Sequence, residues 1–599
     1  MSGLSSLETA VSGLNAAQAG LYVAGHNIAN SDAAGYSRQR VIQSDSYVLN
    51  IGFSPNGTLQ MGLGADIGQV QQLRDLFLDA QYRAEFCRMG FYEAKSQTGI
   101  EIESIIGETQ SQYNFQSVIH DVWNSLNELA ANLEGLDTRG SFIATCGAFA
   151  MKADDVYNRM LSCQRNLDSQ IRNEVERVNE LTSQIHKLNV LIASAEAGGD
   201  RANDFRDERN LCLDELSKII PIEAKEKKNS RVDIVSEGKE LLCNGSSYRL
   251  GLKFASGEYA LVEPVFTESA EILPADARAD EYKPLFEFAG TVDAAHGNDR
   301  GTLMGLMSSR GARPANYLGS EALSAPAPVS KPTPPVPGGY AGGESDPDYL
   351  DDLAKYDADY DAYQRNLTLQ RNYSNDVFSA NNFFIPKAMA QMDKIVNSIV
   401  TMLNDSVAPA SQGVKDKAGG PWNLYSQQPF AEVFKRKGMD RWDGDDLIPV
   451  DEKNFYSQYT MGNITVNPEL LRDGGFNLLA LSPSGDREDN RLANQMIRAW
   501  TGKIVDFGDG ELYSIDDAYN IFTTEVGTET AEDRLFLQEQ GFLAEQLEKK
   551  RDFISGVSLD EQLRDMMIYQ HAYSASARML NAIDSMLERI INAMGRAGR

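Results

Sequence analysis

The sequence has few cysteines, histidines and basic residues for a chain of 599 residues. Its five cysteines lie far apart, with no Cys-x-x-Cys pair and no zinc-type spacing, at positions 87, 146, 163, 212 and 243. We therefore expect neither a disulfide framework nor a metal site. The five histidines show no pairing at four-residue spacing, and neither His-Glu-x-x-His nor Gly-x-Ser-x-Gly occurs.

These absences predict a protein without catalytic residues, without a cofactor and without a bound metal. Carboxylates that folding brings together are the one catalytic arrangement that the sequence leaves open. An enzyme of that kind should show a pocket in which titratable groups converge.

Lysine and arginine together number 56 against 86 aspartates and glutamates, which gives a net charge of −30 at pH 7. A protein that binds a phosphate backbone needs the opposite balance, so we expect no nucleic-acid partner. No stretch approaches the roughly 20 apolar residues of a membrane span, so we expect no membrane insertion. The first Lys or Arg is Arg38, so the basic start of a cleaved signal peptide is missing. We expect a cytoplasmic chain, or one exported by a route that cleaves no signal.

Apolar residues recur at alternating steps of four and three at the carboxyl end. Between Ser558 and Ile591 these positions hold Leu559, Leu563, Met566, Gln570, Tyr573, Ala577, Leu580, Asp584, Leu587 and Ile591. Such a repeat keeps one face of a helix on a partner helix. Ser558 and Glu561 have the spacing of a capping box at the start of this helix.

The amino end shows the same spacing. Residues 4–24 read as a helix whose repeat positions are Leu4, Leu7, Val11, Leu14, Gln18 and Leu21. Gly13 and Gly20 weaken this helix in isolation, so packing must stabilise it. We expect the two ends to form a coiled coil with each other, or to pack on neighbouring copies.

Long helices are expected between the two ends. A helix over 140–197 has a repeat of large apolar residues and ends at Gly198-Gly199, and a shorter helix over 204–219 stops at Pro221. Helical spacing returns over 376–404 and from about 527 to 553. The fold class is therefore expected to be mainly α, a long-helix bundle with inserted β-rich domains.

Over residues 222–310 the helical spacing gives way to short strand-forming runs. Short β-type runs lie at Arg231–Val235, Glu240–Cys243 and Ser247–Leu250, with Asn244-Gly245 as a hairpin turn. Residues 311–345 are rich in proline and glycine, as in a linker. They precede an amphipathic helix with a tyrosine stripe: Tyr349, Leu353, Tyr356, Tyr360, Tyr363 and Leu367.

These patterns predict four domains. Residues 1–35 and 556–599 make a terminal coiled-coil domain, and residues 36–221 and 376–555 make a helical trunk. The trunk carries a loop-rich insertion near 405–475 with a short strand at Asn463–Val466. Residues 222–310 form the β-rich domain, and residues 311–375 form the linker and its acidic helix.

Three short segments near the amino end resemble one known family. They are Gly13-Leu14-Asn15-Ala16-Ala17-Gln18, Asn27-Ile28-Ala29-Asn30 and Gly35-Tyr36-Ser37-Arg38-Gln39. They are similar to the amino terminus of bacterial flagellar axial proteins, and the last segment resembles the hook-associated members. Residues 62–81, 203–216, 481–492 and 556–561 extend the resemblance, which covers about residues 1–310 and 375–599. The acidic segment after the prolines departs from the family pattern.

The resemblance implies a structural subunit of the flagellum that joins hook to filament. Its terminal helices would form the inner coiled coil of a tube, in a helical array of copies. The implied partners are other copies of the chain, the hook protein, a second junction protein, and an export chaperone on the C-terminal helix. The implied location is the extracellular flagellum, reached without a cleaved signal peptide.

The expected assembly interface lies in the terminal helices and in the Asn-Ile-Ala-Asn segment. Its residues are Leu4, Leu7, Val11, Leu14, Leu21, Asn27, Asn30, Leu563, Met566, Tyr573, Leu580, Leu587 and Ile591. Each apolar position could instead belong to a core within one chain. A coiled coil between the two ends is consistent with either role.

Two alternatives stay open. A hook or rod protein of the same family is disfavoured by Tyr36-Ser37-Arg38-Gln39 and by the chain length. A cell-surface binding protein or adhesin would use residues 222–475 for recognition, and it should carry a secretion signal or an anchor.

Overall fold

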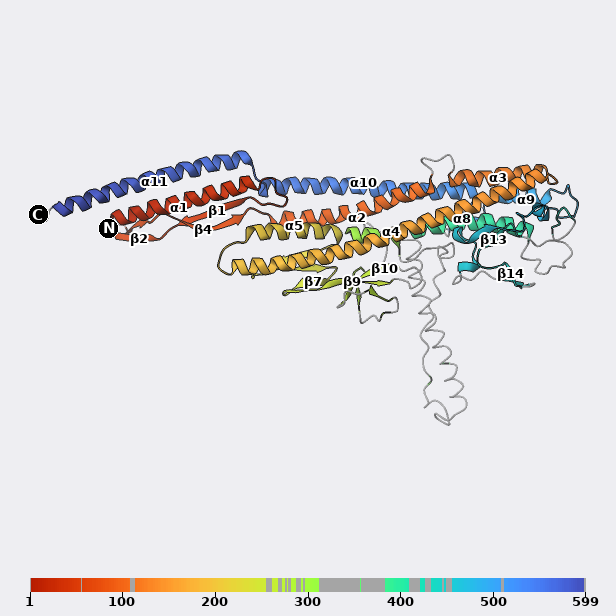
Figure 1. Ribbon diagram of the computed structural model, residues 1–599, viewed down its shortest axis with the longest axis horizontal. Coiled ribbons are helices and arrows are strands. Elements are labelled where there is room, and N and C mark those ends of the chain that lie inside the picture. Colours follow the sequence, from red (N-terminus) through yellow and green to blue (C-terminus); the bar gives the residue numbers. More distant parts are fainter. Residues whose placement is uncertain are drawn as a thin grey trace, which may run out of the picture.

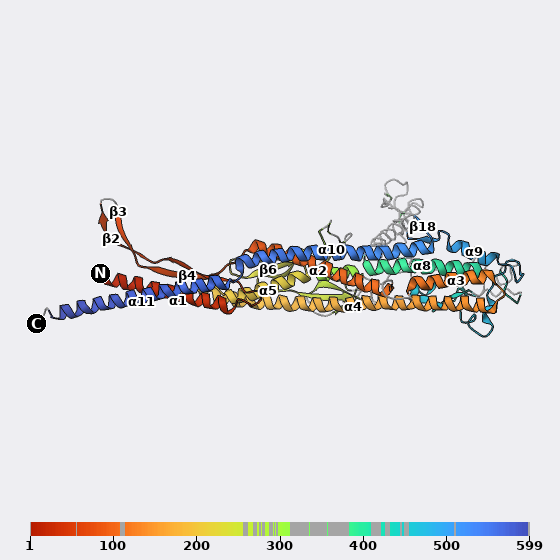
Figure 2. The same cartoon turned by 90° about the horizontal axis from the view of Figure 1, so that it is seen from above.

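The molecule is a long trunk of packed helices from which a pair of terminal helices extends at one end (Figure 1, Figure 2). The computed structural model describes residues 2–54, 57–107, 114–254, 261–267, 272–274, 282–286, 297–311, 383–408, 421–425, 432–443, 446–448, 455–507 and 511–596, and the single positions 277, 292, 294, 335 and 356. The expected mainly α fold with inserted β-rich parts is confirmed. Most of the predicted linker and its tyrosine stripe lie outside the described residues.

The longest trunk helix is α4 (Leu136–Glu196), with 61 residues. Its predicted repeat is buried throughout, at Ile171, Val175, Val178, Leu181, Ile185, Leu188 and Ile192. The trunk also contains α2 (Leu76–Ile106), α3 (Phe115–Ala131), α5 (Asn203–Ile219), α8 (Phe384–Val407) and α10 (Ile515–Ser555). The predicted helices over 140–197 and 204–219 are therefore confirmed, and the one over 376–404 is confirmed from Phe384 onward, since residues 376–382 lie outside the described residues.

Two trunk helices differ from the expectation. Helix α10 begins twelve residues before position 527 because Ser514 caps it, accepting a hydrogen bond from the Asp517 amide at 3.2 Å. Helix α9 (Arg491–Trp500) was not predicted. It packs on the trunk through Trp500, whose ring centroid lies 5.8 Å from that of Trp123.

Two four-stranded sheets flank α4. The first has the order β5-β6-β7-β8, with β5 at Glu223–Glu226, β6 at Val232–Ser236, β7 at Lys239–Cys243 and β8 at Ser246–Ser247. The second has the order β11-β9-β10-β12, with β9 at Arg249–Phe254, β10 at Val262–Thr267, β11 at Ile272–Leu273 and β12 at Lys283–Pro284. The predicted turn is present, since Asn244 and Gly245 have φ values of 51° and 87°. The expectation of β structure up to 310 needs a correction, because residues 302–310 form the buried helix α6 (Thr302–Arg310).

The far end of the trunk has short strands and 3₁₀ turns. Strand β13 (Phe434–Arg436) pairs with β16 (Ile464–Val466), near the predicted strand at Asn463–Val466. Smaller pairs are β14 (Trp442–Asp443) with β15 (Asp446–Leu447), and β17 (Val505–Asp506) with β18 (Leu512–Tyr513). The 3₁₀ turns are η4 (Phe455–Ser457), η5 (Met461–Asn463) and η6 (Gly475–Leu478).

At the opposite end, α1 (Ser2–Ala29) and α11 (Leu559–Arg596) lie side by side. Strands β1 (Gln39–Asp45) and β4 (Ala65–Gln72) form an antiparallel ribbon along α1. The ribbon continues into β2 (Val48–Ser54) and β3 (Gly57–Gly62).

A buried ion pair ties α6 to α4. Arg310 is 1% exposed and donates to the Asp168 carboxylate, which also accepts the Val262 amide of β10 at 2.8 Å. Asp168 therefore joins two helices and a sheet inside the core.

Replacing Arg310 by methionine should destabilise the chain by about 3–5 kcal/mol, because the buried Asp168 carboxylate loses its buried partner and keeps only the more exposed Arg172, at 2.8 Å. Urea unfolding of the full chain measures this loss. The matched control is Arg177→Met, which breaks the exposed pairs with Glu180 and Glu215 and should cost less than about 1 kcal/mol. Equal losses in the two variants would contradict this role of Arg310.

A buried carboxyl in α8 makes the stability depend on pH. Asp393 is 1% exposed, and burial raises its pKa to about 8 although it accepts the Met461 amide at 2.7 Å. The folded chain therefore holds a proton that the unfolded chain releases above about pH 4. Stability from this group consequently falls as the pH rises from about 4 to about 8.

The substitution Asp393→Asn removes this titration while preserving the acceptor for the Met461 amide. The native chain should lose more stability between pH 5 and pH 8 than the variant does. Urea midpoints at the two pH values measure the difference, and parallel losses would show that Asp393 does not titrate as described.

Candidate functional site

The terminal helices α1 and α11 pack antiparallel in a register that repeats every seven residues. A Cβ placed on Gly13 would lie 3.0 Å from Ser576 Oγ, and one on Gly20 would lie 2.5 Å from the Tyr569 ring. Seven residues further along α1, Asn27 Nδ2 donates to Gln562 Oε1 at 2.8 Å. Since seven residues make two helical turns, one face of each helix stays in contact over the whole pair.

The contact face of α1 is built from small residues. It holds Ala10, Gly13, Ala17, Gly20, Ala24 and Asn27, at alternating steps of three and four. All but Gly13 are buried. Small side chains allow two helix axes to approach closely, so the pair is held by backbone proximity and by the larger side chains of α11.

The predicted interface residues of α1 mostly lie outside this contact face. Leu7, Leu14 and Leu21 are half-buried, and Val11 is 40% exposed. Only Asn27 is fully buried in the pair, while Asn30 is half-buried. Leu7, Leu14 and Leu21 are therefore partly covered within one chain, and their part in an assembly interface stays a prediction. The Leu4 side chain is outside the described residues.

The predicted residues of α11 divide between two faces. Met566, Leu580 and Leu587 are half-buried, whereas Leu563 and Ile591 are 50% and 67% exposed. Tyr573 is 37% exposed. The structure instead places Gln562, Tyr569 and Ser576 against α1, one position away from the predicted repeat.

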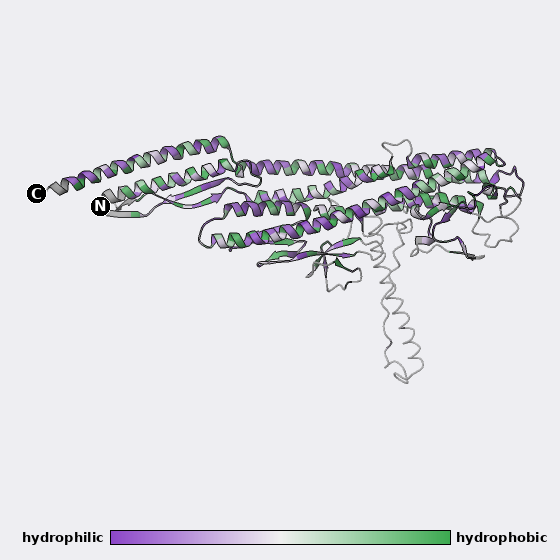
Figure 3. Ribbon diagram, in the orientation of Figure 1, coloured by the Kyte–Doolittle hydropathy of each residue, from purple (hydrophilic) through white to green (hydrophobic). Residues whose placement is uncertain are grey.

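A second apolar line on α11 faces solvent and was missed. Its members are Ile568, Ala572, Ala575, Met579, Ala582 and Met586, all of them exposed. The same four-three spacing, counted from Ile568, would have revealed it. Figure 3 shows hydrophobic residues recurring along both terminal helices beyond the trunk.

Asn27 joins three segments of the chain. Its Nδ2 donates to the Gln39 carbonyl at 2.9 Å as well as to Gln562, and its Oδ1 accepts the Gln39 amide at 3.0 Å. The Tyr36 hydroxyl donates to the same Oδ1 at 2.8 Å, and His26 Nδ1 lies 3.0 Å from that hydroxyl. Burial, with Asp204 and Asp207 nearby, raises the pKa of Tyr36 above its usual range, so the hydroxyl stays protonated and can donate. The Asn-Ile-Ala-Asn segment thus connects α1, the ribbon and α11.

Residues at the start of α5 form hydrogen bonds with the trunk-side ends of strands β1 and β4. Asn203 Nδ2 donates to the Val70 carbonyl at 3.1 Å, and Asp207 accepts the Ser37 amide at 3.1 Å. Burial raises the pKa of the Asp207 carboxyl, and its hydrogen bonds with Ser37 oppose that shift. Gln39 Nε2 also donates to Asp204 at 3.1 Å. The segment 203–207 therefore fixes the terminal unit to the trunk.

Two arginines stabilise the end of the trunk from which the terminal helices extend. Arg551 of α10 contacts Asp79 of α2 at 3.0 Å and Asp214 of α5 at 2.7 Å, and its guanidinium lies 4.3 Å from the Tyr82 ring centroid. Burial alone would lower the pKa of Arg551, but the two carboxylates raise it, so the charge is retained. Arg38 pairs with Glu561 at the start of α11.

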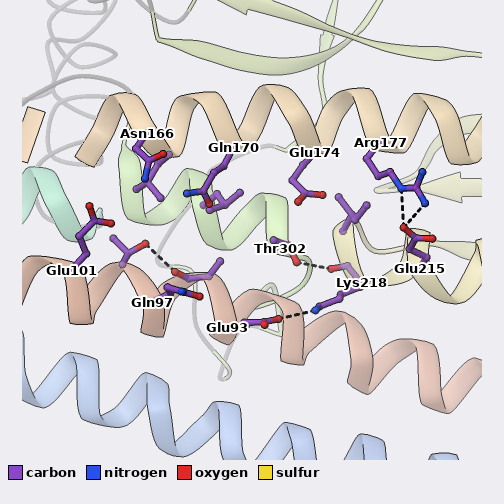
Figure 4. A pocket seen from close by; sticks show the side chains of 15 residues that line it. Glu93, Gln97, Glu101, Asn166, Gln170, Glu174, Arg177, Glu215, Lys218 and Thr302 are labelled. Atoms are coloured by element: carbon purple, nitrogen blue, oxygen red, sulfur yellow. Dashed lines mark hydrogen bonds and ion pairs between the residues drawn. The ribbon is translucent and has the colours of Figure 1, made fainter. Parts of the chain in front are cut away.

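The trunk contains a groove of about 540 Å³ between α2, α4, α5 and α6 (Figure 4). Four of its charged side chains form two ion pairs, Lys218 with Glu93 at 2.8 Å and Arg177 with Glu215 at 2.6 Å. Burial raises the pKa of Glu174 in the same groove.

Hydroxyl groups in this groove are already engaged. Thr98 donates to the Ala94 carbonyl at 2.9 Å, and Thr302 donates to the Lys218 carbonyl at 3.1 Å. No histidine, cysteine or serine is among the residues that line the groove. The groove therefore lacks an activated nucleophile with an adjacent base.

Among the residues that the structure describes, no set of three or more His, Cys, Asp or Glu side chains is arranged to hold a metal ion. Over the same residues, no helix has an apolar stretch long enough to cross a membrane.

Comparisons with known proteins match the trunk and both ends. Residues 100–315 match the family model of the flagellar hook-associated protein FlgK helical domain. Residues 7–36 match the flagella basal body rod protein model, and residues 554–593 match the C-terminal model of the flagellar basal body rod FlgEFG proteins.

Similar whole proteins come from several bacteria. Flagellar hook-associated protein 1 of Bacillus subtilis is 26% identical over 595 residues, covering 99% of each chain. Its counterpart in Escherichia coli is 24% identical over 613 residues, covering 98% of this chain and 99% of the relative. The structure of the flagellar hook junction protein FlgK from Burkholderia pseudomallei matches with a TM-score of 0.49 and 11% identity, covering 80% of this chain and 100% of that chain.

These matches define a structural protein of the bacterial flagellum whose two ends are of the axial-protein type. Within that class, the chain belongs to the family of flagellar hook-associated protein 1, FlgK.

Close approach at Gly20 provides a test of the α1–α11 pair. The substitution Gly20→Ala would place a Cβ 2.5 Å from the Tyr569 ring, so the ring or α11 itself must shift and the contact loosens. We expect faster amide hydrogen exchange in residues 562–587 of the full-length chain. The control is Gly25→Ala in the same helix, where no atom lies within 4 Å of the added Cβ, and exchange should not increase. Equal exchange in both variants would contradict the packing at Gly20.

Proposed function

We propose that this chain is the subunit that joins hook to filament, and that it assembles through the outward faces of its terminal helices. The observation that carries the proposal is the composition of α1. Its close contacts with α11 are at Gly13 and Gly20, while Leu7, Leu14 and Leu21 are only half-buried and Val11 is 40% exposed. Large apolar residues left outside an internal contact favour a contact with another molecule.

The charge pattern of α1 supports the same role. Glu8 is the only Asp, Glu, Lys or Arg among its 28 residues. A surface helix normally carries charged residues on its solvent face, so an almost uncharged helix favours burial in an assembly. Helix α11 adds exposed Leu563, Met579, Met586 and Ile591 to the available apolar surface.

In this proposal the terminal domain comprises residues 1–35 and 556–599. Other copies of the chain bury its apolar faces as a coiled coil in a helical array, because head-to-tail contacts can repeat without closing. The partners along the axis are the hook protein on one side and a second junction protein on the other. An export chaperone covers the C-terminal helix beforehand, and export cleaves no signal peptide.

The protein performs no reaction in this proposal. The trunk groove supports this, since its paired charges and engaged hydroxyls lack the arrangement that acyl or phosphoryl transfer requires. Net charge of −30 likewise favours protein partners over nucleic acid.

The test combines location with two substitutions. Tagged native chain, labelled on intact appendages, should appear at the boundary of hook and filament. The double variant Val11→Glu with Leu563→Glu should leave trunk melting unchanged, because both side chains are at least 40% exposed. It should nevertheless lose incorporation, because the two charges would be buried in the assembled tube.

The matched control is Ser574→Glu, which adds one charge at another exposed position of α11. Its incorporation should stay near the native level. Normal incorporation of the double variant would show that these faces are not the assembly surface. Native label elsewhere in the cell would refute the proposed function.

A further inference from the structure

The Asn27 amide uses all four of its hydrogen-bonding positions. Its Oδ1 accepts the Gln39 amide at 3.0 Å and the Tyr36 hydroxyl at 2.8 Å. Its two Nδ2 hydrogens go to the Gln39 carbonyl at 2.9 Å and to Gln562 Oε1 at 2.8 Å. Because the backbone of Gln39 supplies both a donor and an acceptor, the Asn27 amide can face only one way. The bond to Gln562 of α11 therefore depends on the orientation that the other partners set.

The direction of the Tyr36 hydrogen bond determines which nitrogen of His26 carries a hydrogen. The Tyr36 hydroxyl has one hydrogen, and it goes to Asn27 Oδ1, which can only accept. His26 Nδ1 lies 3.0 Å from the same hydroxyl oxygen. The nitrogen must therefore be the donor in this contact, so the neutral ring carries its hydrogen on Nδ1.

A second contact leads independently to the same tautomer of His26. Asn30 Nδ2 donates to the His26 carbonyl at 3.0 Å, so the nitrogen of the Asn30 amide faces the ring. The same Nδ2 lies 3.4 Å from His26 Nε2. A ring nitrogen that faces an N–H group must accept, so Nε2 carries no hydrogen. Asp204 Oδ2 is 4.0 Å from Nε2, beyond hydrogen-bonding distance. The ring is therefore held between Asn30 and Tyr36.

We infer that His26 is a positioning residue of the α1–α11 pair and acts on Gln562 through Tyr36 and Asn27. Each member donates to the next, and we call this series from His26 to Gln562 the His26 relay. Hydrogen bonds that follow one another in this way strengthen each other. Asn30 contributes from the other side, because it orients the His26 ring. The inference rests on the proposed function in one respect, since the pair that the relay closes is the proposed assembly unit.

Two substitutions at His26 distinguish the two ring nitrogens. Asparagine can place an N–H group where Nδ1 lies, whereas glutamine reaches toward the position of Nε2. We expect His26→Asn to leave amide hydrogen exchange in residues 562–587 of the full-length chain near the native rate. We expect His26→Gln to raise it about three- to tenfold, because the bond to Tyr36 is lost. Helix propensity alone gives the opposite order, since glutamine favours a helix more than asparagine does.

The relay also requires the Tyr36 hydroxyl. Tyr36→Phe should raise exchange at least as much as His26→Gln does, and in the Tyr36→Phe background the two His26 variants should exchange equally. The matched control is Tyr22→Phe. The Tyr22 ring stacks on His26 with centroids 6.3 Å apart, but the residue is 74% exposed, so exchange should stay at the native rate.

Trunk melting should stay native in every variant, which assigns the change in exchange to the terminal pair. Slower exchange in His26→Asn than in His26→Gln, with the difference lost in the Tyr36→Phe background, supports the relay. Equal rates in the two His26 variants, or faster exchange in His26→Asn, overturn it. These rates are measured on the free chain. Their failure therefore leaves the proposed function standing, and a wrong location of the chain leaves the relay standing.

Discussion

Close packing of α1 against α11 is the constraint on which the rest of the terminal unit depends. Gly13 and Gly20 leave room for Ser576 and Tyr569, and this approach sets the register that brings Asn27 to Gln562. A pair held by small residues uses little of its apolar surface internally. Several larger apolar side chains consequently stay exposed, among them Val11, Leu563 and Ile591, where another subunit can cover them.

Hydrogen bonds and ion pairs between the trunk and the α1–α11 pair hold the pair in a fixed orientation. Asn27 binds the ribbon, α5 clamps the ribbon base, and Arg551 connects α10 to α2 and α5. Polar side chains suit this position because a hydrogen-bonded network fixes direction, whereas apolar contacts alone allow sliding. The motif residues that resemble axial proteins are therefore mainly those that orient the terminal unit.

The sequence predicted elements whose packing uses large apolar residues. The repeat from Ile171 to Ile192 in α4 is buried throughout, as expected. The contact face of α1 was missed because alanine and glycine produce no hydrophobic repeat. The β1–β4 ribbon was missed as a pair because glutamines such as Gln39, Gln43 and Gln69 hide its alternation. Joints depend on residues distant in the chain, such as Arg551 with Asp79, which no local pattern reveals.

The bond between Asn27 and Gln562 spans 535 positions of the chain. Helix α1 therefore leaves the ribosome long before α11, and the Asn27 amide finds this partner only after the 535 positions between them have been made. A product that ends between Ser555 and Gln562 would keep all the trunk helices but could not form this hydrogen bond. Closure of this one amide consequently acts as a check that the molecule is complete.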